Sequence, residues 1–196
     1  MKSSIVIGVI LFLLLVIFGV GGCSYNSMVD KEEKVRSQWA QVENAYQRRS
    51  DLIPNLVNTV KGAANFEKET LTAVMQARAS ATQVKLNADN LTDENLKTFQ
   101  QAQANVSSAL SRLLVSVEAY PDLKANQNFR ALQDELSGTE NRISVERKRF
   151  NELVQEYNKQ VRSFPANLMA GMFGFTQKAY FESKEGADKP PEVNFQ

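Results

Sequence analysis

A run of uncharged, apolar residues, Ile5–Val20, constrains this chain more than any other feature, because it predicts a protein that works at a membrane. A spanning helix needs about 20 apolar residues, with a range of about 17–25. The Gly-Gly-Cys sequence that follows extends the uncharged stretch to that length, and Lys2 gives it a positive flank. The sequence therefore predicts a short flank over residues 1–4 and a transmembrane anchor over residues 5–23.

Cys23 supports a second interpretation of the same segment. The sequence Val20-Gly21-Gly22-Cys23 resembles the small-residue pattern that precedes a lipidated cysteine. A cleaved secretory signal is a third interpretation, although no A-x-A-like cleavage site follows the run. The uncleaved anchor is favoured, and Cys23 is the candidate lipidation site if the lipoprotein interpretation holds.

Charges on the two sides of the run bear on the orientation of the chain. Lys2 and the amino terminus lie on one side, whereas Lys31, Lys34 and Arg36 lie well beyond the other end. Because positive charge tends to stay in the cytoplasm, we expect a single-pass membrane protein with its domain on the translocated side. The charge difference is small, so the opposite orientation also fits.

The composition argues against several classes of function. Lys and Arg total 23 and Asp and Glu total 22, and a net charge of +1 offers no field that would attract nucleic acid. The chain has no histidine, which removes the commonest general base and metal ligand. A single cysteine excludes an intrachain disulfide, and no phosphate-binding loop or nucleophile elbow occurs. We therefore expect no enzyme activity, no catalytic residues, no metal and no cofactor.

Four long segments carry apolar residues at alternating spacings of three and four, the pattern of packed helices. The fourth segment shows it most plainly, with an apolar residue at every seventh position from Phe129 to Phe164. Short connections between such segments are typical of an up-down bundle. The sequence predicts an all-α fold, in which an N-terminal transmembrane helix precedes an antiparallel up-down four-helix bundle with two long and two shorter helices. This bundle covers residues 26–175, and a disordered tail covers residues 183–196.

The helix boundaries can be predicted in part. The first bundle helix is expected to begin near Asn26 or Ser27 and to continue through a kink at Ser50–Pro54. Proline removes one backbone hydrogen bond and disfavours helix at the residue before it, so two separate helices are the alternative. The second helix is expected to begin near Asn65, with an alanine-rich face.

Arg49 occupies an apolar seam position, where a charge needs a partner. In an antiparallel register that places Ser27 level with Arg162, Glu140 lies opposite Arg49. A buried arginine without an acceptor costs several kcal/mol, so we expect an Arg49–Glu140 pair, shared with Asp51 or Glu146. The pair is interpreted as a structural polar layer that fixes the register, and a binding or catalytic role is the alternative.

A methionine- and phenylalanine-rich segment follows Pro165. The expected register returns the fourth helix towards the membrane, so this segment should lie near the bilayer surface. It is either a cover for the open end of the bundle or a foot that lies in the membrane interface.

Several motifs, in order along nearly the whole chain, resemble the LemA family. They are Tyr25-Asn26, Gln47-Arg48-Arg49-Ser50-Asp51-Leu52-Ile53-Pro54-Asn55-Leu56-Val57, Thr59-Val60-Lys61-Gly62, Tyr120-Pro121-Asp122-Leu123-Lys124-Ala125-Asn126, Asn128-Phe129, Thr139-Glu140-Asn141-Arg142-Ile143, Tyr157-Asn158, Phe164-Pro165 and Phe181-Glu182. Two positions depart from the family pattern. Ala63 stands where an aromatic residue is usual, and Phe66 precedes Glu67 where histidine is common.

The resemblance implies a bacterial membrane protein with a single anchor and an antiparallel helical bundle. It implies no activity, because the family's biochemical role is poorly defined. Members are often encoded near membrane proteases or other envelope proteins, and one branch belongs to magnetosome membranes. Some members look like lipoproteins and others place the domain in the cytoplasm, so the alternatives for the anchor and the orientation stay open.

The leading hypothesis is a non-enzymatic, membrane-anchored scaffold or adaptor of the bacterial envelope. Its partner would be a membrane protease or another envelope protein, bound at a face formed by Arg48, Asp51, Asn55, Asn126 and Asn128. Helix capping and turn formation explain the same residues without a partner. The alternative function is a self-assembling structural protein that organises membrane, a homo-oligomer joined through its long helices or its anchor. An envelope enzyme is a third, weaker hypothesis.

Overall fold

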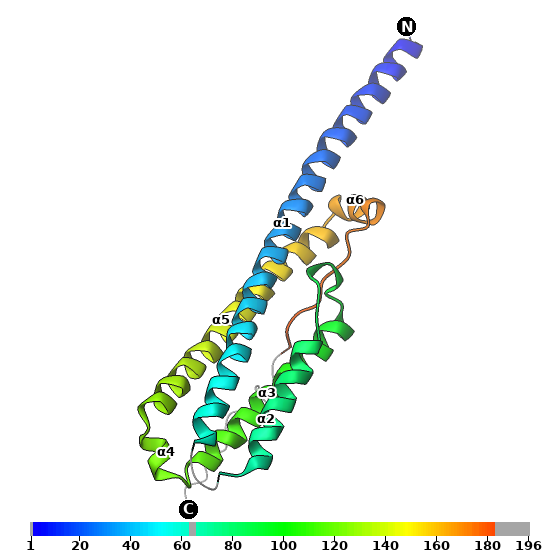
Figure 1. Ribbon diagram of the computed structural model, residues 1–196. Helices are drawn as coiled ribbons and strands as arrows, with labels where there is room; N and C mark the ends of the chain where they lie inside the picture. The colour runs from blue at the N-terminus through cyan, green and yellow to red at the C-terminus, as the bar shows by residue number, and fades with distance from the viewer. Residues whose placement is uncertain (1, 63–65, 183–196) are drawn as a thin grey trace, which may run out of the picture.

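The longest element is α1 (Lys2–Lys61), one continuous helix of 60 residues. The computed structural model describes residues 2–62 and 66–182. At about 1.5 Å per residue the helix is about 90 Å long, and its N-terminal part extends well beyond the other helices (Figure 1). The predicted start of a separate bundle helix near Asn26 or Ser27 is therefore wrong. Glycine and asparagine weaken a helix by about 1 kcal/mol or less, and with no proline before residue 54 the two helical stretches join.

Within the part of the chain that the structure describes, no helix combines the length and the apolar character that crossing a membrane requires. Most side chains of the Ile5–Val20 run lie outside that part, as does the whole of the predicted tail over residues 183–196. The transmembrane anchor remains a prediction.

The remaining elements form a helical bundle against the C-terminal half of α1, and every described element is helical, which confirms the all-α prediction. α5 runs antiparallel to α1 along most of its length, and α2 lies beside α3 (Figure 1). The elements are α2 (Lys68–Gln83), the short 3-10 helix η1 (Ala88–Asn90), α3 (Asp93–Val117), α4 (Pro121–Ala125), α5 (Gln127–Arg162) and α6 (Ala166–Phe173).

Local signals explain several of these boundaries. The Thr92 hydroxyl accepts a hydrogen bond from the backbone N–H of Asn95 and begins α3, which is the usual role of an N-cap threonine. α2 begins at Lys68, not at Asn65, which lies outside the described residues. α1 continues through Pro54, so the alternative of two separate helices is wrong.

The buried side chains form two clusters along the bundle. The aromatic cluster, nearer to α6, contains six buried aromatic residues and lies between α1, α3, α5 and the C-terminal segment: Trp39, Tyr46, Phe99, Phe150, Tyr157 and Phe181. The aliphatic cluster, nearer to α4, is built mainly from leucine, isoleucine and valine of α1, α2, α3 and α5: Leu52, Ile53, Leu56, Val57, Val60, Leu71, Val74, Val106, Leu110, Leu113, Val117 and Leu136.

The chain reverses after α6 and returns along the bundle as a non-helical segment, residues 174–182, which we call the strap (Figure 1). Gly174 has a positive φ of 78° and ends α6, a conformation that glycine adopts without steric cost. Lys178, Ala179 and Phe181 of the strap are buried, so the packed domain continues past residue 175.

Candidate functional site

Arg49 of α1 is the most deeply buried charged residue among the described residues, with 2% of its side chain exposed. Its Nη1 donates to Glu140 Oε1 at 2.6 Å and to Ser107 Oγ at 2.8 Å. Its Nη2 donates to Gln103 Oε1 at 2.6 Å and to the Gln103 carbonyl oxygen at 3.2 Å. One guanidinium thus joins three helices, because Gln103 and Ser107 belong to α3 and Glu140 to α5.

The structure brings Arg49 and Glu140 together, as the antiparallel register led us to expect. The two other acids considered as partners, Asp51 and Glu146, have hydrogen-bond partners of their own. Asp51 accepts a hydrogen bond from the side chain of Gln47, and Glu146 accepts one from Gln38. Gln103 and Ser107 complete the site, and sequence reasoning did not identify them, because a glutamine and a serine on a helix carry no signal of their own. We call Arg49, Gln103, Ser107 and Glu140 the polar layer.

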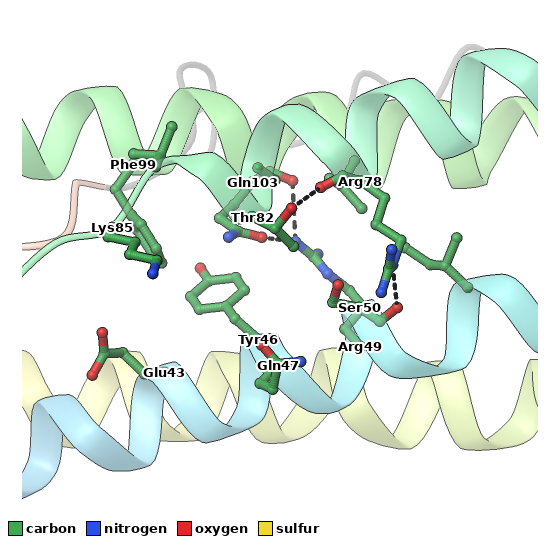
Figure 2. A pocket seen from close by; sticks show the side chains of 14 residues that line it. Glu43, Tyr46, Gln47, Arg49, Ser50, Arg78, Thr82, Lys85, Phe99 and Gln103 are labelled. Carbon is green, nitrogen blue, oxygen red and sulfur yellow. Dashed lines mark hydrogen bonds between the residues drawn. The ribbon is translucent and has the colours of Figure 1, made fainter.

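A cavity of about 180 Å³ lies beside the polar layer, between α1, α2 and α3 (Figure 2). Its lining includes Tyr46, Arg49 and Gln103, and these three residues also line a second hollow of about 380 Å³ on the side of α5. The Arg49 guanidinium carbon lies 5.1 Å from the centre of the Tyr46 ring. Burial raises the pKa of the Tyr46 hydroxyl, and the nearby charge of Arg147 partly offsets this effect.

Arg78 of α2 compensates for the proline in α1. Pro54 has no N–H, so the carbonyl of Ser50, four residues earlier, loses its helical hydrogen bond. The Nε of Arg78 donates to that carbonyl oxygen at 2.8 Å (Figure 2). An unpaired buried carbonyl would cost about 1–3 kcal/mol, so this contact explains how α1 passes through Pro54 at the edge of the cavity.

The groups at the site hold three helices together. The Ser50 hydroxyl is buried and has no hydrogen-bond partner in the described structure, and a serine nucleophile needs an adjacent base to become reactive. The described residues include no group of three or more acidic or cysteine side chains that could bind a metal ion. In the polar layer the two terminal nitrogens of Arg49 donate to Glu140, Ser107 and Gln103.

The strap is fixed by two asparagines of α5 that sequence reasoning missed as a pair. The side chain of Asn158 accepts from the backbone N–H of Lys178 at 2.9 Å and donates to its carbonyl at 2.8 Å. Asn151 makes the same two contacts with Phe181, at 2.8 and 2.9 Å. Two asparagines spaced seven residues apart on one helix face are the sequence signal that was available. Each asparagine side chain thus pairs with both backbone groups of one strap residue, as the backbone of a neighbouring β-strand would.

The five residues of the predicted partner face separate into two groups. Arg48, Asp51 and Asn55 are exposed on α1, and the side chain of Arg48 pairs with Glu135 of α5. Asn126 instead begins α5, where its side chain accepts hydrogen bonds from the backbone N–H groups of Asn128 and of the next residue. Capping therefore accounts for Asn126, whereas in the exposed group on α1 the side chain of Arg48 pairs with Glu135 and that of Asp51 accepts a hydrogen bond from Gln47.

Cys23 lies within α1 and is exposed. The backbone there is part of the continuous helix, three residues after the end of the Ile5–Val20 run. The structure thus leaves the thiol accessible for the lipidation considered above, and Cys23 stays a candidate site.

Comparison with known proteins supplies the family. The LemA family model matches residues 38–195. Among curated proteins, the chain is 25% identical over 183 residues to magnetosome protein MamQ 2 of Paramagnetospirillum magneticum, covering 85% of this chain and 67% of the relative. It is 24% identical over 160 residues to protein LemA of Metamycoplasma hominis, covering 82% and 69%. The matched region contains the polar layer, the strap and both core clusters, and the chain belongs to the LemA family.

Proposed function

We propose that this chain is a non-enzymatic scaffold of the bacterial envelope, in which a membrane anchor and an antiparallel up-down four-helix bundle are joined as one rigid unit. The observation that carries the proposal is the continuity of α1, which leads from the apolar run through the polar layer without a break. A flexible linker would let the domain move freely, whereas a continuous helix holds the domain at a fixed distance and angle relative to the anchor helix itself. The relatives named for magnetosomes are consistent with work at a membrane.

The partner face in this proposal is the exposed side of α1 around Arg48, Asp51 and Asn55. These residues lie three and four positions apart, so they share one helix face. The partner is a membrane protease or another envelope protein. The expected orientation places the bundle on the translocated side of a single-pass anchor.

A charge swap separates a partner role of Arg48 from its role within the chain. Arg48→Glu removes the ion pair with Glu135, and the combination with Glu135→Arg restores an ion pair in the opposite sense. A photo-crosslinking residue at position 55 then reports what lies against the face in native membranes, with identification by mass spectrometry. If Arg48 binds a partner, crosslinking falls in the single variant and stays low in the double variant.

Full recovery of crosslinking in the double variant would show that only the internal ion pair matters and would count against the face. Arg112→Glu, an exposed charge reversal on α3, is the matched control and should leave crosslinking unchanged. Recovery of only this chain in the crosslinked product would instead favour the self-assembling, membrane-organising protein.

A further inference from the structure

α6 exposes an unusual amount of apolar surface at the end of the bundle from which the N-terminal part of α1 extends. Phe164, Leu168 and Met172 are 82%, 60% and 76% exposed. Leu168 and Met172 lie four residues apart on one face of α6, and Phe164 lies in the turn that precedes the helix. The opposite side of α6 is also apolar, since Ala166 and Ala170 are each 3% exposed and pack against the bundle. The bundle therefore already covers one face of α6, and the outward face serves something else.

The position of α6 along α1 identifies the occupant. The ring of Phe173 lies 4.9 Å from the ring of Tyr25, and the ring of Phe175 lies 5.6 Å from it. Tyr25 follows the end of the Ile5–Val20 run by five residues, about 8 Å along a helix. Both interpretations of residues 5–23, an anchor or a lipidated Cys23, place the bilayer surface at this level.

The charge pattern agrees with that position. No charged residue occurs from Ser163 to Gln177, and none occurs in α1 from Ser3 to Val29. The end of the molecule around α6 is thus free of charge on both of its segments, although charged residues make up 23% of the chain. A second protein chain would usually meet such a helix with a polar rim, whereas the acyl region of a bilayer accepts an uncharged apolar face directly.

We propose that the outward face, formed by Leu168 and Met172 of α6 together with Phe164 of the preceding turn, inserts into the interfacial region of the bilayer as a second membrane contact beside the N-terminal anchor. This inference rests on the proposed anchoring of α1. Helices that lie in the interface bury their apolar side about 5–10 Å into the boundary between headgroups and acyl chains. Two contacts on one rigid body would fix the tilt of the bundle relative to the membrane, which a single helix would not.

The test uses the full chain with Cys23→Ser and one new cysteine, labelled with an environment-sensitive fluorophore and reconstituted in phosphatidylcholine vesicles. One sample carries Met172→Cys and the matched control carries Val115→Cys, a residue of α3 that is 73% exposed in the other half of the molecule. Lipids with a nitroxide near the headgroup quench fluorophores in the interface. We expect the label at position 172 to lose most of its fluorescence and the label at position 115 to keep it, also at high salt and without anionic lipid.

Vesicle flotation of the same samples separates the two proposals. If the protein floats with the vesicles but the label at position 172 is not quenched, the membrane contact of α6 is wrong and the anchor stands. If the protein does not float, either in these samples or with Cys23 intact, the proposed anchoring fails and this inference fails with it. Quenching that requires anionic lipid, or protection of position 172 by a second copy in a detergent-stable dimer, would also overturn insertion of the apolar face.

A second variant guards against an effect of the label itself. Leu168→Asp combined with Met172→Asp places two charges on the outward face, at positions that make no core contact. With a label at position 164, quenching should be lost while flotation and helix content stay unchanged. Asn167→Asp, an exposed change on the same helix, is the control and should leave the quenching intact.

Discussion

The two core clusters are enclosed in different ways. The aliphatic cluster is enclosed mainly by helices, and its buried side chains follow the seams of α1, α2, α3 and α5, with Phe66 and Tyr120 of the connections packed against it. The aromatic cluster lies beyond α2, where one side of the bundle lacks a helix, and the strap fills that side with Phe181. Phe181 stacks on Trp39 with ring centres 5.9 Å apart. The difference shows that this half depends on a non-helical segment whose backbone must be hydrogen-bonded by side chains.

The polar layer separates the two clusters and is the part of the core that tolerates no shift. Sliding α5 by one turn along α1 would still pair apolar residues with apolar residues. It would, however, leave the guanidinium of Arg49 without Glu140. We interpret this layer as the feature that selects one register, a use of buried polar groups known from coiled coils.

The largest expected effect is loss of the aromatic centre. Trp39 contacts Phe99, Phe150 and Phe181, and its indole N–H donates to the Leu86 carbonyl at 3.1 Å. Trp39→Ala should lower the free energy of unfolding by about 3–5 kcal/mol, as large-to-small changes in a core do. Urea unfolding in detergent, followed by circular dichroism, measures it.

Leu56→Ala in the aliphatic cluster is the matched change, because Leu56 is fully buried. It should cost about 2–5 kcal/mol but leave the strap protected in hydrogen exchange. Equal exposure of the strap in both variants would contradict the separation of the two halves.

The next effect concerns the polar layer. Glu140→Ala leaves Arg49 buried without its counter-ion, which costs about 3–5 kcal/mol for a fully buried pair. Glu140 is 45% exposed, so we expect about 2 kcal/mol here. Arg49→Met combined with Glu140→Leu should recover most of that loss, since an apolar pair can replace a buried ion pair. Arg49→Met and Glu140→Leu are also measured alone in urea unfolding. If their separate losses of stability simply add up in the double variant, direct coupling is contradicted.

A smaller effect should follow from releasing the strap. Asn158→Ala leaves the backbone N–H and carbonyl of Lys178 without partners, at a cost of about 1–2 kcal/mol. The amides of residues 178 and 181 should then exchange faster, whereas those of α2 and α3 keep their protection. Thr98→Ala, an exposed change on α3, is the control. Unchanged exchange at residue 178 would show that apolar contacts alone hold the strap.

The smallest expected effect is an increase in stability, whereas the changes described so far lower it. The hydroxyl of Tyr157 is buried and has no hydrogen-bond partner in the described structure, so Tyr157→Phe should stabilise the protein by about 0.5–1 kcal/mol at neutral pH. Burial raises the pKa of Tyr157 to about 12, and the charge of Glu32 acts in the same direction.

The unfolded chain loses the Tyr157 proton near pH 10, before the folded chain does. The free energy of unfolding therefore falls as pH rises from about 10 to 12. Urea unfolding across that range should show a shallower decline for Tyr157→Phe than for the unchanged chain. Tyr180→Phe, an exposed tyrosine of the strap, is the control. Parallel declines in all three proteins would contradict a buried, protonated Tyr157.

The sequence by itself determined the all-α class, the seven-residue seam of α5 and the meeting of Arg49 with Glu140. Each of these follows from spacing along one helix or from an antiparallel register, both of which are readable in one dimension. Only the tertiary structure decided that Gln103 and Ser107 complete the polar layer, that Arg78 pairs with the carbonyl freed by Pro54, and that Asn151 and Asn158 hold the strap. These contacts join residues 20 to 58 positions apart through polar side chains that look like ordinary surface residues until a second segment lies against them. The continuity of α1 past residue 26, by contrast, follows from the chain itself, because glycine and asparagine weaken a helix only slightly and no proline precedes residue 54.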